Sequence, residues 1–134
     1  MRATVESGAA WLAAERSTPR EVFRLEVMVD WIDDPARTDK RWILDAQLHV
    51  AIAEMSRNER LVEIVLEQKA AGARLFAPLD PEWSDPARWN GDRIVAAIGR
   101  RDGHAASEAM RDHILALRSY ATSAIDLIAA RGAP

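Results

Sequence analysis

Residues 44–58, LDAQLHVAIAEMSRN, contain a carboxylate and an imidazole at a spacing that suits metal binding. Asp45 and His49 stand four positions apart, beside the apolar stripe of a predicted helix. Because each helical residue turns by about 100°, side chains four positions apart lie on the same face. A carboxylate and a neutral imidazole one turn apart can both reach a single cation. The pair therefore predicts polar chemistry on the side of this helix that should face the core.

His113 is a third polar residue in a predicted interior. The apolar stripe around it consists of Ala106, Met110, Leu117, Tyr120, Ala124 and Leu127. Burying an imidazole without a partner would cost about 1–3 kcal/mol, so His113 requires one. Two helices thus direct Asp45, His49 and His113 toward one interior. The three could hold a metal, or Asp45 could be the hydrogen-bond partner of a histidine in a metal-free cluster, and the spacing alone favours neither.

The elements that position these residues follow a helical period throughout, and no segment alternates with period two. Connections are mostly short, which is typical of an antiparallel bundle. We therefore predict an all-α fold of about six helices in a single domain, 1–134. The expected N-caps are Ser17 or Thr18, Thr38, Asn58 and Asp102. The expected helices are 4–16, 17–32, 38–56, 59–76, one from Pro86 through RIVAAIGRR, and 102–131.

Composition excludes several classes of protein. Cysteine is absent, so disulfides and thiolate metal sites are both excluded. The net charge of -3 gives no general attraction to nucleic acid or to an anionic membrane. No apolar run approaches the roughly 18 residues needed to span a bilayer, and no signal peptide opens the chain. We expect a soluble cytoplasmic domain without a membrane partner.

Three segments in order resemble the FCD domain, the C-terminal effector-binding domain of FadR-type regulators in the GntR family of bacterial transcription regulators. RATVESGAAWLAAERSTPREV is similar to the first two helices of that family. LDAQLHVAIAEMSRNERL matches its D-x-x-x-H segment with the following capping Asn. RIVAAIGRRDGHAASEAMRDHI matches the junction of its fifth and sixth helices, including the closing His. The resemblance implies an all-helical bundle that senses a small molecule.

The resemblance also implies a metal site, with one departure. Many members bind a divalent metal through an Asp and three His, and Asp45, His49 and His113 match three of these positions. The fourth position is Gly91 in this sequence, which supplies no ligand. Asn90 is turned by about 100° from it and is a poor substitute. Zn, Ni, Mn or Fe could be held by the three remaining residues with open positions, or the metal could be lost and an organic effector bound directly.

The partners follow from the same resemblance. We expect a small carboxylate metabolite as effector, with Arg2 as a candidate clamp for its carboxylate. We expect a homodimer as well. These regulators normally carry an N-terminal winged helix-turn-helix, and no such segment precedes Met1, so this chain is not expected to contact nucleic acid directly.

Two alternatives stand beside the sensor. Two His and one carboxylate with open positions also form the ligand set of non-haem iron oxygenases, which would make the chain an enzyme. A degenerate bundle that binds nothing and serves only for dimerisation is the second alternative. Turnover would indicate the enzyme, and stabilisation by an effector without turnover would indicate the sensor.

Overall fold

The computed structural model describes residues 2–76 and 90–132, and within them it contains helices and no strand. This confirms the predicted all-α fold. The α-helices are α1 (Arg2–Arg16), α2 (Pro19–Asp33), α3 (Arg41–Met55), α4 (Glu59–Phe76), α6 (Gly91–Gly99) and α7 (Gly103–Gly132). A 3-10 helix, η1 (Pro35–Lys40), joins α2 to α3. The helix start expected at Pro86 lies outside the described residues.

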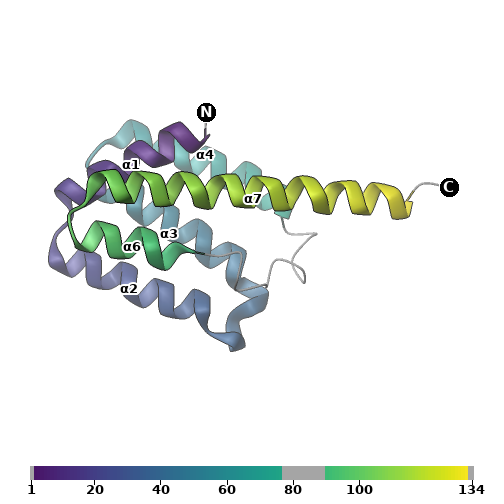
Figure 1. Ribbon diagram of the computed structural model, residues 1–134, viewed down its shortest axis with the longest axis horizontal. Coiled ribbons are helices and arrows are strands. Elements are labelled where there is room, and N and C mark those ends of the chain that lie inside the picture. Colours follow the sequence, from purple (N-terminus) through teal and green to yellow (C-terminus); the bar gives the residue numbers. More distant parts are fainter. Residues whose placement is uncertain (1, 77–89, 133–134) are drawn as a thin grey trace.

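The longest helix, α7, runs along the bundle and extends past the other helices at its C-terminal end (Figure 1). It packs against α1 and α6, while α3 packs against α1, α2 and α4. Gly103 permits the close approach of α7 to α1, because a Cβ atom there would lie 3.0 Å from the indole of Trp11. The two helices that carry the candidate ligands, α3 and α7, therefore both border α1.

The core is a continuous apolar cluster to which every described α-helix except α4 contributes buried side chains. It explains the helical period of the sequence, since its members recur three and four positions apart. On α7 the predicted stripe is buried at Ala106, Met110 and Leu117. The side chains of Tyr120, Ala124 and Leu127 lie outside the described set. Large side chains in the core cluster include Leu25, Ile32, Leu48, Ile52, Ile94, Ile98 and Met110.

Most of the predicted helix starts are confirmed by their caps. Thr18 forms a capping box with Glu21, in which each side chain accepts a hydrogen bond from the other residue's backbone N–H. Asn58 Oδ1 accepts from the backbone of Arg60 and Leu61 at the start of α4. Asp102 Oδ1 accepts from the backbone N–H of Ala105 in the first turn of α7. These bonds satisfy donors that a helix start leaves unpaired.

The predicted start of α3 near Thr38 is wrong. The segment from Pro35 to Lys40 forms η1, and the α-helix begins only at Arg41. The reason is a long-range contact: the buried Arg41 side chain donates from Nε to the carbonyl of Ile32 at 2.9 Å. This bond ties the beginning of α3 to the end of α2 and leaves the intervening residues to close a tight connection.

Two helices end at an arginine in the left-handed conformation. Arg57 follows α3 and Arg101 follows α6, each with a φ of 58°. Glycine usually occupies this position because a side chain there costs energy. Both arginines make contacts that offset this cost. Arg57 pairs with Glu21 of α2, and Arg101 donates to backbone carbonyls at the end of α1.

Candidate metal centre

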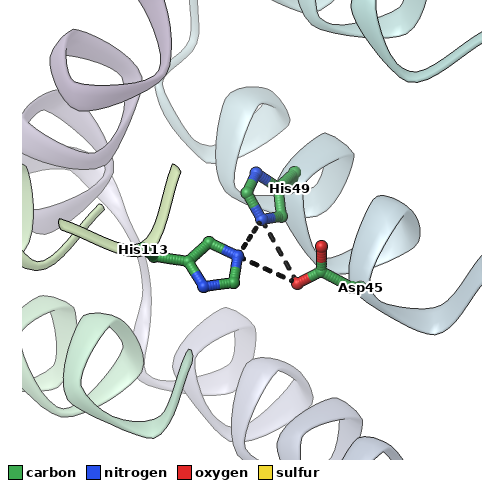
Figure 2. Close-up of side chains that lie close together, drawn as sticks. All are labelled: Asp45, His49 and His113. Carbon is green, nitrogen blue, oxygen red and sulfur yellow. Dashed lines mark hydrogen bonds and ion pairs between the residues drawn. The ribbon is translucent and has the colours of Figure 1, made fainter. Parts of the chain in front are cut away.

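The three candidate ligands meet inside the bundle, as Figure 2 shows. Asp45 and His49 come from α3, and His113 comes from α7. Nε2 of His49 lies 3.0 Å from Nε2 of His113, and Asp45 Oδ1 lies 3.3 Å and 3.2 Å from these two nitrogens. Relative exposures are 4% for Asp45, 1% for His49 and 0% for His113. Three donor atoms thus form a compact triangle with almost no access to bulk water.

The dimensions of this triangle fit a single metal ion. With metal–nitrogen bonds of about 2.0–2.1 Å, neighbouring donors are about 3.3–3.4 Å apart in a tetrahedral site and about 3.0 Å apart in an octahedral one. The three observed separations, 3.0 to 3.3 Å, fall within this range. Two imidazoles and one carboxylate also suit Zn, Ni, Mn or Fe chemically. One face of a coordination shell is therefore already assembled.

Each histidine presents Nε2 to the triangle because its Nδ1 is engaged elsewhere. His49 Nδ1 lies 2.6 Å from Oε1 of Glu6, a buried residue of α1. His113 Nδ1 lies 3.2 Å from Oδ1 of Asn90. Partners of this kind fix both the ring orientation and the nitrogen that is available to a metal. Asn90 therefore acts on the far side of the His113 ring and does not join the three donors.

Glu6 was missed in the sequence and is the largest addition that the structure makes. Its Oε2 accepts from Nε of Arg2 at 2.8 Å, and Nζ of Lys69 on α4 lies 3.0 Å from its Oε1. The Lys69 contact has the distance of an ion pair without the angles of a hydrogen bond. One signal was available: Glu6 precedes Ala10 and Ala13, both fully buried, by four and seven positions. Arg2, the candidate effector clamp, thus contacts Glu6 in this structure.

The electrostatics of the cluster keep both carboxylates ionised. Burial raises the pKa of Asp45, but the charges of His49 and His113 and their hydrogen bonds outweigh it and hold that pKa well below its ordinary value. Burial likewise raises the pKa of Glu6, but His49, Lys69 and Arg2 together lower it far more. Ionised carboxylates are the form that binds a metal or accepts a hydrogen bond from a ring N–H.

The two histidines are shifted in opposite directions. Burial and the Lys69 ammonium lower the pKa of His49, but Asp45 and Glu6 on its two sides raise it above the ordinary value. Burial lowers the pKa of His113, and Asp45 offsets this only in part. His49 is therefore the ring that more readily carries a second proton.

Gly91 follows Asn90, the partner of His113 Nδ1, and begins α6. It is buried and is the first residue of the helix, after Asn90 in a non-helical conformation. A glycine at this position avoids most of the cost that it would have in a helix interior, where about 1 kcal/mol is typical. Gly91 itself offers no side chain that could bind a metal.

A separate apolar groove of about 770 Å³ lies between α2, α3 and α4. Its walls include the exposed side chains of Phe23, Trp31 and Leu66. None of the three donor residues lines it, since Asp45 and His49 lie on another side of α3 and His113 lies on α7. Its largely apolar walls offer little to a small anion, so we place the ligand chemistry at the buried triangle.

Comparison with known families decides the identity of the fold. Residues 1–116 match the model of the FCD domain. The chain belongs to the FCD domain family. FCD domains are the effector-binding domains of GntR-family transcription regulators, so this bundle is a domain of that class. Comparison with curated proteins and with solved structures gives no match. None of the helices in the described ranges is both long and apolar enough to cross a membrane.

Proposed function

We propose that this FCD domain senses a small carboxylate metabolite through a divalent metal held by Asp45, His49 and His113. The observation that carries the proposal is the triangle of Asp45 Oδ1 and the two Nε2 atoms, with sides of 3.0 to 3.3 Å. The three atoms have the mutual separations of neighbouring donors around one metal ion. A bound divalent ion would supply positive charge and open coordination positions for the oxygens of an effector.

The number of protein ligands supports a direct contact between metal and effector. Three protein donors leave one position open in tetrahedral geometry and three in octahedral geometry. The resemblance to the family implies a fourth ligand at Gly91, and glycine supplies no donor there. Arg2 is placed on α1 next to Glu6, with its side chain about 29% exposed, and remains our candidate for a charged contact to the effector carboxylate.

The proposed regulatory step depends on which helices carry the three metal ligands. Asp45 and His49 lie on α3 and His113 lies on α7, so a metal and its effector bridge two helices of the bundle. An effector shifts a conformational equilibrium only if it binds one helix arrangement more tightly than the other. In a homodimer, which we also propose from family membership, such a shift would change the relative placement of two subunits. We also propose a cytoplasmic location, which a role in the regulation of transcription supports.

The proposal is tested by the metal content of protein purified without a histidine tag or chelator. We expect near-stoichiometric Zn, Ni, Mn or Fe in the wild type and its loss in His113→Ala. The matched control is His104→Ala, on the same helix, whose side chain is 72% exposed and pairs with Glu108. Absence of metal from the wild type, even after reconstitution, would contradict the proposal and leave a hydrogen-bonded cluster.

The effector is tested on metal-loaded and metal-free protein in parallel. A carboxylate that binds the folded state at 100 times its dissociation constant stabilises it by about 2.7 kcal/mol. We expect the thermal midpoint to rise with carboxylate only in the metal-loaded sample. Equal shifts in both samples would mean that the carboxylate binds without the metal.

The donor set also supports a second function, that of a non-haem iron enzyme, because two His and one carboxylate on one face are typical of iron oxygenases. Membership of a family of transcription regulators favours the sensor. Turnover of a bound metabolite by iron-loaded protein would reverse this preference.

A further inference from the structure

We infer that Glu6 is a positioning residue for the metal centre: its carboxylate accepts the Nδ1 proton of His49 and so directs Nε2 of that ring to the metal. The inference rests on the proposed function, because it requires an ion at the three donor atoms. The observation that supports it is the 2.6 Å contact between Glu6 Oε1 and His49 Nδ1, which joins α1 to α3 across the core.

The burial of Glu6 shows that this contact is held by the fold. The residue is 1% exposed, in a helix whose other buried residues are mostly alanines. Burying a carboxylate costs several kcal/mol unless it is paired and hydrogen-bonded. Here Arg2 holds one oxygen and His49 holds the other. Orienting the ring of His49 gives this buried charge a role that alanine could not fill.

A carboxylate behind a metal-bound imidazole acts through the ring. It fixes the tautomer with Nδ1 protonated, holds the plane of the ring, and makes Nε2 more basic. The corresponding partner of His113 is the neutral Oδ1 of Asn90, at the longer distance of 3.2 Å. Because hydrogen bonds to an ionised acceptor are about twice as strong, His49 is the more firmly positioned of the two rings.

Lys69 opposes the effect of Glu6 on the His49 ring. Its Nζ lies 3.0 Å from Oε1, the same oxygen that faces His49, and its side chain is nine-tenths buried. The ammonium therefore reduces the pull of Glu6 on the Nδ1 proton and adds a positive charge near the cation site. Its removal should strengthen metal binding, whereas removal of Glu6 should weaken it. Two neighbouring side chains thus have predicted effects of opposite sign.

The test measures zinc affinity by competition with a chromophoric chelator for the wild type, Glu6→Gln, Glu6→Ala and Lys69→Met. We expect a loss of roughly 10- to 100-fold for Glu6→Ala, because partners behind a metal ligand have effects of this size. Glu6→Gln keeps an acceptor oxygen and the shape of the side chain, so its loss should be smaller. Lys69→Met should bind zinc several-fold more tightly than the wild type.

A control and a spectroscopic readout separate positioning from packing. Ser7→Ala changes a buried neighbour on α1 whose hydroxyl has no hydrogen-bond partner among the described residues, and it should leave zinc affinity unchanged. Nitrogen-15 spectra of zinc-loaded protein should show a slowly exchanging Nδ1 proton on His49 in the wild type and fast exchange in Glu6→Ala. A merely structural role would leave this proton protected in every folded variant.

The outcomes also distinguish the two proposals. Zinc binding by the wild type with equal affinity in both Glu6 variants would overturn the positioning role and leave the metal centre intact. Weaker zinc binding by Lys69→Met than by the wild type would overturn the inference that Lys69 and Glu6 have opposite effects on zinc affinity. No zinc binding by the wild type would overturn the proposed function and this inference together.

Discussion

Nε2 of His49 and Nε2 of His113 lie 3.0 Å apart, so in the absence of a metal a hydrogen bond between them needs a proton on one of the two nitrogens. Nδ1 of each ring faces an oxygen acceptor, Glu6 Oε1 or Asn90 Oδ1, and so carries a proton of its own. With both Nδ1 atoms protonated as well, such a hydrogen bond makes one of the two rings a cation. Burial and Lys69 lower the pKa of His49, but Asp45 and Glu6 outweigh them and raise it. Burial lowers the pKa of His113, so these directions favour His49 as the cation.

Metal binding should release the shared proton. A divalent ion at the three donors replaces it, because a ring nitrogen binds a metal through its lone pair. We expect about one proton per ion at neutral pH, measured by calorimetry in two buffers of different ionisation enthalpy. Since the pKa of His49 is raised, protons compete at a higher pH than for an ordinary histidine, and affinity should rise with pH through that range. Identical heats in the two buffers would contradict the assignment.

Gly91→His should add a fourth protein ligand. Gly91 is buried at the start of α6, directly after Asn90, whose Oδ1 contacts Nδ1 of His113. We expect zinc affinity to increase roughly tenfold or more, because four protein ligands close a tetrahedral site. The stabilisation by carboxylates should decrease, since an open position is lost. Gly91→Ala is the matched control, and equal behaviour of the two variants would show that this position does not reach the metal.

The sequence was sufficient where a residue acts within its own helix. Helical period and caps predicted α4 at 59–76 and placed Asp102 before α7, as the structure has them. Asp45, His49 and His113 could be chosen because each interrupts or borders an apolar stripe. The structure brings these three together, and their role as metal ligands stays a prediction.

The sequence was insufficient where a contact spans distant segments. Glu6 meets His49 from 43 positions away, and in the sequence it looks no different from Glu15, a solvated acidic residue of the same alanine-rich helix. The start of α3 depends on Arg41 reaching the carbonyl of Ile32, a bond that no local pattern encodes. Periodicity gives the face of a helix but not the neighbour that the face will meet.

Glu21→Gln should reduce stability in a pH-dependent way. The hydrogen bonds from Arg57, opposed by slight burial, lower the pKa of Glu21 from 4.5 to about 2. A carboxyl with a lowered pKa stabilises the fold above pH 4.5, and this contribution is lost as the pH falls toward 2. Gln retains an acceptor for the capping box at Thr18, while it loses the charge and one of the two hydrogen bonds from Arg57.

Urea unfolding at several pH values measures this effect. We expect the stability difference from the wild type to be largest near neutral pH and to shrink below pH 4.5, with a modest size because Arg57 is about half exposed. Glu63→Gln is the control, since Glu63 pairs with Arg60 on the exposed face of α4. A difference for Glu21→Gln that is constant across pH would contradict the ion pair.

Arg101 should reveal how much backbone strain the end of α6 contains. Its guanidinium donates to the carbonyls of Ala14, Glu15 and Ser17, while its φ of 58° lies in the left-handed region. Arg101→Ala and Arg101→Gly both lose these hydrogen bonds, each worth about 0.5–1.5 kcal/mol. Only glycine also relieves the strained conformation, so Arg101→Gly should be more stable than Arg101→Ala by about 1 kcal/mol.

The comparison of these two variants is independent of the metal centre. Both should unfold at lower urea than the wild type, and the gap between them measures the cost of a side chain at this φ. Arg100→Ala, at the preceding exposed residue in a right-handed conformation, should change stability by less than about 0.5 kcal/mol. If Arg101→Ala were as stable as Arg101→Gly, the left-handed conformation would cost nothing at this site. The three hydrogen bonds from Arg101 to carbonyls at the end of α1 would then stabilise the fold without compensating for any backbone strain.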